Sequence, residues 1–269
     1  MPPPHFEPIP EAFFRELPAK HDSEAVTALS ALQPSPLRPR QFYGHGSWGY
    51  TVLRTVYTPE SDVLFPIAME RLKRLVHYWC HYNRFPAYGA FCERERIDYT
   101  EPNDQLARRF FLDVVEDREG LAHLDHKGSA DYFRRWLTGI DTSGAPHCEP
   151  RFSSYLVVDA ESLASLAKIP DELPPLQCPA TKKDKADTLG TGYPAWLWLV
   201  ELKCMAQPAG HHTDAYPGWL RIEPPSILST WKDHHAWNMP ECNHWVCLGH
   251  QENPEGSGIY CFNADRVRL

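Results

Sequence analysis

Five apolar segments of the chain each have an ionisable residue among or directly after their apolar residues, and these five are the first candidates for chemistry. They are Arg54, Asp113, Asp159, Glu201 and Arg221. A charge on a buried strand is costly unless it is paired or reaches water at a strand end. In a structural interpretation, Asp159 caps the helix that follows it, and the two arginines neutralise Asp113 or Glu201.

In a functional interpretation, the same five residues meet at the carboxyl edge of a sheet, where open α/β proteins bind ligands. Arg54 and Arg221 would then bind the substrate, since a guanidinium clamps a carboxylate or phosphate. The three acids would be catalytic, because a carboxylate can hold an amine or act as a base. The sequence leaves both interpretations open.

Ser61 lies in the turn TPESD between the first apolar segment and a long helical one. A serine at such a bend is a candidate catalytic nucleophile, with free helix N–H groups as the oxyanion site. The alternative is a helix cap, in which Ser61 or Asp62 accepts hydrogen bonds from the first helical N–H groups. Ser61 lacks the glycines of a G-x-S-x-G elbow, so the cap is the favoured interpretation.

The polar face of the long helical segment carries Glu70, His77 and His81, with Arg74 beside them. Histidines at positions i and i+4 can ligate a metal or titrate as a pair. We include Glu70, His77 and His81 as candidate substrate-binding residues. A solvated polar face is the alternative.

Four potential zinc ligands lie close together near the end of the chain, in ECNHWVCLGH: Cys242, His244, Cys247 and His250. Thiolates and imidazoles are the ligands that zinc prefers. The spacing lacks the long loop that separates the two ligand pairs of a zinc finger. The alternative is therefore a group of reduced side chains in an aromatic tail, and the sequence indicates no other cofactor.

The stretch 49–82 predicts the elements that position Arg54 and Ser61. Tyr50–Tyr57 alternates in the manner of a strand. Val63–Tyr82 has helical periodicity, with a core stripe formed by Leu64, Ala68, Leu72, Leu75, Val76 and Trp79. Further strands are predicted at 108–116, 153–159, 194–202 and 218–223, with helices after most of them.

Strands that are apolar on both faces belong to covered, commonly parallel sheets. We therefore predict an α/β or mixed α+β fold, with a central, largely parallel sheet of about five strands covered by helices. The last two strands are candidates for an antiparallel addition. Residues 1–41 are predicted to be a Pro-rich arm and 42–236 the core domain, with an exposed insertion at 170–192. Residues 237–269 are predicted to be a Cys/His/Trp-rich extension packed on the core.

Composition narrows the class of protein. The chain has 269 residues, of which 42% are hydrophobic, so it can bury a sizeable core. A net charge of −8 weighs against non-specific nucleic-acid binding. No apolar run is long enough to span a membrane, and the start lacks a signal-peptide pattern. With eight scattered cysteines interpreted as free thiols, we predict a cytoplasmic protein with a small-molecule substrate.

Several strings carry a resemblance to a known family: YTVLRTVYTPESDVLFPIAMERLKRLVHYWCHYNRFPAYG, NDQLARRFFLDVVED, RFSSYLVVDAESLASL, AWLWLVEL and YPGWLRIE. Over roughly residues 42–232 they resemble a large family of uncharacterised intracellular proteins of ascomycete fungi. A bacterial domain of unknown function is similar in its VLRT, VVD and DAESL-like strings. The family has no assigned activity, so the resemblance implies no site residues.

Ser61 also carries a second resemblance, to the fungal arginine-containing cyclodipeptide synthases. Those enzymes use aminoacyl-tRNA and have a nucleophilic serine just after an early strand. The resemblance implies an enzyme of specialised metabolism that transfers acyl or aminoacyl groups, with tRNA as a partner. The alternatives are a non-catalytic ligand- or protein-binding module and a protein stabilised by zinc.

Overall fold

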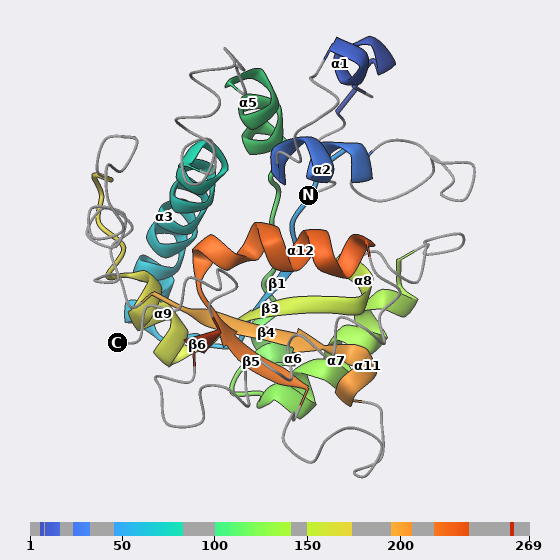
Figure 1. Ribbon diagram of the computed structural model, residues 1–269. Helices are drawn as coiled ribbons and strands as arrows, with labels where there is room; N and C mark the ends of the chain where they lie inside the picture. The colour runs from blue at the N-terminus through green and yellow to red at the C-terminus, as the bar shows by residue number, and fades with distance from the viewer. Residues whose placement is uncertain are drawn as a thin grey trace.

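The computed structural model describes residues 6–7, 9–16, 24–32, 46–82, 100–140, 150–173, 195–205, 218–236 and 259–260. These residues form one six-stranded sheet with the strand order β2-β1-β3-β4-β5-β6 (Figure 1). The strands are β1 Thr51–Arg54, β2 Asp113–Val115, β3 Ser154–Val158, β4 Leu197–Glu201, β5 Trp219–Ile222 and β6 Ile259–Tyr260.

Strand direction makes the sheet largely parallel. Strand β1 pairs in parallel with both β2 and β3, and β5 pairs in parallel with β6. Strand β4 is antiparallel to both of its neighbours, β3 and β5. The predicted α/β fold is therefore confirmed, and the predicted antiparallel addition consists of β4 alone.

Helices cover both faces of this sheet (Figure 1). They are α1 Glu11–Glu16, α2 Glu24–Ala31, α3 Pro59–Tyr82, α5 Thr100–Arg108, α6 Arg118–Leu121, α7 His126–Thr138, α8 Pro150–Ser153, α9 Ala160–Leu166, α11 Leu202–Met205, the 3₁₀ turn η1 Pro224–Ser226 and α12 Ile227–Ala236. Helices α6, α7 and α11 lie on the opposite side of the sheet from α12 (Figure 1).

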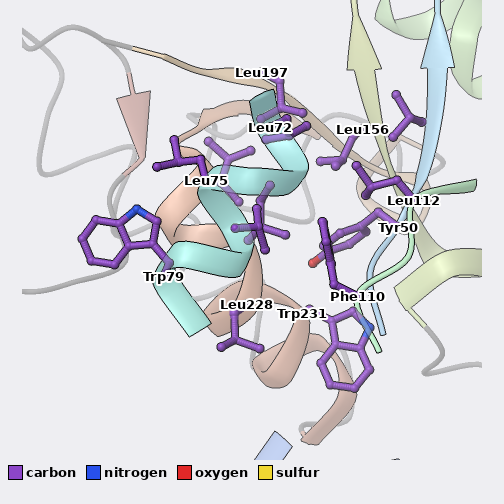
Figure 2. Packing of buried hydrophobic residues seen from close by; sticks show 14 of the residues in the cluster. Tyr50, Leu72, Leu75, Trp79, Phe110, Leu112, Leu156, Leu197, Leu228 and Trp231 are labelled. Atoms are coloured by element: carbon purple, nitrogen blue, oxygen red, sulfur yellow. The ribbon is translucent and has the colours of Figure 1, made fainter. Parts of the chain in front are cut away.

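The larger core lies on the α3 side of the sheet. Leu72, Leu75 and Trp79 of α3 pack with Tyr50, Leu156 and Leu197 of the sheet segments (Figure 2). The smaller core lies on the other side, where Leu53 and Val157 of the sheet pack with Phe133 of α7. Because successive strand residues point to opposite faces, one strand supplies both cores, which explains why these strands are apolar throughout.

Helix α3 begins one turn earlier than predicted, at Pro59 instead of Val63. Its core stripe runs through Phe65, Ala68 and Leu72, all of which are buried. The prediction that Leu64 belongs to this stripe is wrong, because its side chain is 39% exposed. Phe65 occupies the core side of that turn instead, and Leu64 lies about 100° round the helix from it.

The ends of the chain join this core only in part. Ala25, Ala28 and Leu29 of α2 are buried in the larger core, so this piece of the predicted arm packs against α5 and α12. Residues 174–192 of the predicted insertion lie outside the described residues, as does all of the predicted extension except β6. Among the described helices, none combines the length and the apolarity needed to cross a bilayer.

Candidate functional site

The five strand charges lie at two opposite edges of the sheet, so they do not all meet at the carboxyl edge as the functional interpretation required. Arg54 is the last residue of β1, Asp159 follows β3, and Arg221 lies near the end of β5. Asp113 is the first residue of β2, at the other edge. Glu201 ends β4, but β4 runs in the reverse direction, so Glu201 is also at that other edge.

Arg54 occupies the place where an open α/β sheet commonly binds a ligand. The chain leaves β1 towards α3 on one face, and leaves β2 towards α6 and α7 on the other. Such divergence between neighbouring parallel strands opens a crevice at their carboxyl ends. In this protein the guanidinium of Arg54 occupies that position, and its side chain is only 6% exposed.

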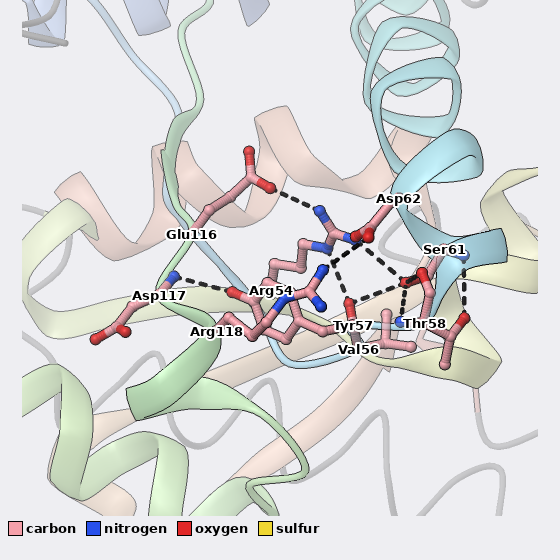
Figure 3. Close-up of polar contacts among 9 residues, drawn as sticks. All are labelled: Arg54, Val56, Tyr57, Thr58, Ser61, Asp62, Glu116, Asp117 and Arg118. Carbon is pink, nitrogen blue, oxygen red and sulfur yellow. Dashed lines mark hydrogen bonds and ion pairs between the residues drawn. The ribbon is translucent and has the colours of Figure 1, made fainter.

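Hydrogen bonds use every part of that guanidinium (Figure 3). Nη1 donates to Glu116 Oε2 at 2.7 Å, and Nε donates to the carbonyl of Val56 at 2.8 Å. Nη2 donates to Ser61 Oγ at 3.1 Å and to Asp62 Oδ1. The group thus joins the ends of β1 and β2 to the start of α3, and the chain's own carboxylates fill the position of a ligand anion.

A second layer of contacts surrounds the Arg54 network. The guanidinium carbon of Arg54 lies 4.6 Å from the ring centre of Tyr57 and 4.7 Å from that of Phe65. Arg118 donates to Asp62 Oδ2 at 2.7 Å. This bond, together with the one from Arg54, holds the pKa of Asp62 below its usual value. The network is thus an internally balanced group of charges.

Ser61 serves as part of a helix cap, although not as the N-cap itself. The Ser61 N–H donates to Thr58 Oγ1 at 3.1 Å, and the Thr58 N–H donates to Ser61 Oγ at 2.7 Å (Figure 3). Thr58 is therefore the N-cap of a capping box. The expectation that Ser61 or Asp62 is the cap residue is corrected accordingly, and Pro59 takes the first helical position.

The capping box leaves the Ser61 oxygen no spare hydrogen-bonding capacity. Its Oγ accepts from Thr58 and Arg54 and donates to the Thr58 carbonyl at 2.9 Å, which uses both lone pairs and the proton. Only 4% of the residue is exposed. The acyl-transfer role of Ser61 stays a prediction, and the geometry favours the structural role.

Asp159 makes the same kind of cap at the start of α9. Its Oδ1 accepts from the Ser162 N–H at 2.8 Å, and the Asp159 N–H donates to Ser162 Oγ at 2.9 Å. The predicted cap is therefore confirmed. Its second oxygen, Oδ2, accepts from Trp198 Nε1 at 2.8 Å. Asp159 thereby fixes the orientation of an indole at the carboxyl edge.

That indole belongs to a group of half-buried side chains, four rings and one guanidinium, which we call the aromatic platform: His126, Trp196, Trp198, Trp219 and Arg221. The ring of Trp198 lies 5.1 Å from Trp196 and 4.5 Å from His126, and His126 lies 5.0 Å from Trp219. The guanidinium carbon of Arg221 lies 4.2 Å from the ring centre of Trp196 and 5.1 Å from that of Trp198.

Strand register explains how the platform forms. Trp198 is directly opposite Arg221 in the β4–β5 pair, and Trp219 is opposite Val200. Residues that alternate along paired strands share one face, so Trp198, Trp219 and Arg221 all face the side of α7. The AWLWL string carried a signal for this: its two tryptophans alternate with leucines. Sequence reasoning singled out Arg221 but missed the rings around it.

His126 is the titratable ring of the platform, at the first position of α7 after the N-cap Asp125. Burial lowers its pKa, although the nearby carboxylates Asp159 and Asp125 act in the opposite direction. The helix N-terminus adds to the preference for the neutral form. His126 is therefore a neutral imidazole at pH 7, and sequence reasoning did not identify it.

The lowered pKa of His126 predicts a loss of stability in mild acid. The unfolded chain titrates this histidine near 6.5, so it binds more protons than the folded chain between the two pKa values. Stability falls as the pH drops below about 6.5, and this loss is complete below the folded pKa. Urea unfolding midpoints should therefore fall less for His126→Phe than for wild type between about pH 7.5 and about pH 5.5. Equal falls would contradict the prediction.

The other predicted residues lie apart from the platform. Glu70 and His77 are exposed on α3, and His81 is half-buried with Nδ1 3.5 Å from Asp104 Oδ1. In the described part of the chain, no three His, Cys, Asp or Glu side chains gather as a metal ion would need. The zinc candidates Cys242, His244, Cys247 and His250 lie outside the described residues.

The fold and the site define the chain as an α/β protein with a largely parallel sheet and an aromatic surface at its carboxyl edge. Comparison of the chain with models of known protein families, with curated proteins and with solved structures finds no match.

Proposed function

We propose that this protein binds a flat heteroaromatic small molecule that carries a negative charge, such as a mononucleotide, on the aromatic platform. The observation that carries this proposal is the cation–π contact of Arg221 with both Trp196 and Trp198, beside a third indole and the imidazole of His126. The proposal belongs to the ligand-binding alternative of the sequence-based predictions.

Stacking supplies the first part of the recognition. Indole rings that keep part of their surface in water offer large, rigid apolar contact area. Stacking of a nucleobase on an aromatic side chain contributes about 1–3 kcal/mol and tolerates any base. The Trp198 ring is held by its hydrogen bond to Asp159. A ligand therefore meets a surface whose orientation is already set, which reduces the entropy cost of binding.

Arg221 supplies the second part, the preference for an anion. The guanidinium carbon of Arg221 lies over the Trp196 and Trp198 rings, and a guanidinium held by such cation–π contacts still has N–H groups that a phosphate or carboxylate can accept. Its ion pair with Glu161 is long, at 3.5 Å, and the Glu161 side chain is exposed. Water screens such a pair, so a ligand anion can compete with Glu161.

The two arginines of the carboxyl edge differ in how easily a ligand anion can reach them. Arg54 is buried and holds two carboxylates of the chain at short distance, whereas Arg221 is half-buried on a ring surface. Replacing the chain's own carboxylates by a ligand anion costs less free energy at Arg221 than at Arg54, because less buried charge is left unpaired. The platform is therefore the better binding surface.

Titration of the full chain with adenosine monophosphate, adenosine and inorganic phosphate tests the proposal, with tryptophan fluorescence as the readout. We expect the monophosphate to bind, adenosine to bind more weakly, and phosphate alone to leave the fluorescence unchanged. Trp198→Leu should weaken binding about tenfold or more. Arg221→Gln should remove the difference between monophosphate and adenosine.

The matched controls use residues of the same edge outside the platform. Arg118→Gln should bind like wild type, because Arg118 contacts Asp62 and the Tyr57 ring, neither of which belongs to the platform. Within the platform, Trp196→Leu provides a second variant that removes a ring, for use if Trp198→Leu folds poorly. The proposal is wrong if the four common ribonucleoside monophosphates and flavin mononucleotide all fail to bind at about 1 mM, or if both ring variants keep wild-type affinity.

A further inference from the structure

The exposed large hydrophobic side chains of the described residues lie together on one helix. They are Val63, Leu64 and Ile67 of α3, which are 65%, 39% and 43% exposed. Positions three and four apart lie on the same side of a helix, so these three form one apolar stripe. The core stripe of α3 lies on the opposite side, which leaves this one without a role in the described core. Apolar side chains gathered in this way mark interaction surfaces.

Charges of opposite sign flank the apolar stripe along the helix. Exposed Glu60 lies one turn before it, near the helix start. Arg71 and Arg74 lie one and two turns after Ile67, and the only acid paired with them among the described residues is Asp171. Two arginines against one aspartate leave a positive charge at this end. Glu70 and Lys73, in the same turns, are of opposite sign and do not change that balance.

We propose that a second copy of this chain covers the stripe, with the two α3 helices packed antiparallel across a two-fold axis near Leu64 and Ile67. In this arrangement each stripe packs on the other, and Glu60 of each copy lies opposite Arg71 and Arg74 of its partner. A two-fold contact of this kind is closed, because each surface patch meets itself. The proposal is independent of the proposed ligand.

The charge pattern favours a second copy over an unrelated partner. A single helix that carries acid, apolar stripe and base in this order is complementary to itself when reversed. A parallel arrangement would place Glu60 against Glu60 and the arginine pairs against each other, which costs energy. One helix stripe covers less than the roughly 800 Å² per partner of a stable interface. The dimer should therefore dissociate in the micromolar range.

Sedimentation velocity of the full chain over a concentration series tests this inference. Wild type should shift from monomer to dimer in the micromolar range. Ile67→Asp should stay monomeric, with at least a tenfold weaker association, and should fold normally because the side chain is exposed. Glu60→Arg and Arg74→Glu should each weaken the dimer, and the double variant Glu60→Arg/Arg74→Glu should associate more tightly than either single variant, though less tightly than wild type because Arg71 keeps its charge.

Each other outcome overturns a part of the inference. Wild-type protein that stays monomeric up to about 100 μM shows that no second copy binds the stripe. A dimer that Ile67→Asp leaves intact lies on another surface. If Ile67→Asp dissociates the dimer but the charge-exchanged double variant associates no more tightly than either single variant, the antiparallel arrangement is wrong. Circular dichroism of each variant identifies any that has lost its fold.

Discussion

Replacing Arg54 by alanine is expected to lower the free energy of unfolding by about 2–4 kcal/mol. The substitution removes a buried guanidinium that bonds Glu116, Ser61, Asp62 and the Val56 carbonyl. It also removes the cation–π contacts with Tyr57 and Phe65, an interaction that contributes about 0.5–2 kcal/mol. The released carboxylates reach water, so the cost is smaller than for a fully buried ion pair.

Urea unfolding monitored by circular dichroism measures this effect, and Arg118→Ala is the matched control. Arg118 belongs to the same network but is exposed, and it makes one ion pair, with Asp62. Its removal should cost less than about 1 kcal/mol. Arg54→Lys should lie between the two, because an ammonium keeps the charge but loses the planar fork. If Arg54→Ala is no more harmful than Arg118→Ala, the network is not structural, and a ligand role for Arg54 regains support.

Replacing Asp159 by alanine is expected to cost about 2–3 kcal/mol. The change removes the N-cap of α9, a cap being worth about 0.5–2 kcal/mol. It also leaves the Trp198 indole N–H without its acceptor at the half-buried edge. Because Asp159 orients Trp198, we expect the variant to show a shifted tryptophan emission and a weaker affinity for the mononucleotide probe.

The matched control for this change is Asp125→Ala, which removes the N-cap of α7 but no contact to an indole. Its expected cost is about 1 kcal/mol, with unchanged emission. Asp159→Asn keeps oxygen acceptor capacity and should recover part of the lost stability. Equal costs for Asp159→Ala and Asp125→Ala would show that the bond to Trp198 contributes nothing to stability.

Local sequence chemistry predicted most of the elements and one of the caps. The helical period of 63–82 and the apolar strands reappear in the structure, because they follow from repeating local geometry. The Asp159 cap was predicted from its position before a helix. At the start of α3, the N-cap was assigned to Ser61 or Asp62, whereas it is Thr58. Thr58 precedes Pro59, and proline suits the first turn of a helix, so α3 starts there.

The candidate site could not be predicted from local sequence, because its residues come from segments that lie far apart in the chain. Arg54 meets Glu116, which follows β2, and Trp198 meets Arg221 of β5. The spacing of residues along the chain predicts neither of these contacts. The aromatic platform was missed for this reason, although alternation in 196–199 already placed two indoles on one face of a strand.

The sequence by itself determined most of the strands and longer helices, and therefore the α/β class, because apolar periodicity and capping act over a few residues. It did not reveal α5, and the strand predicted at 108–116 is shortened to Asp113–Val115. Only the tertiary structure decided which of the five strand charges share an edge. Strand direction places Arg54, Asp159 and Arg221 at one edge and Asp113 and Glu201 at the other, since β4 runs against its neighbours. The direction and register of a strand depend on how whole elements pack, so they cannot be predicted from the residues next to it in the sequence.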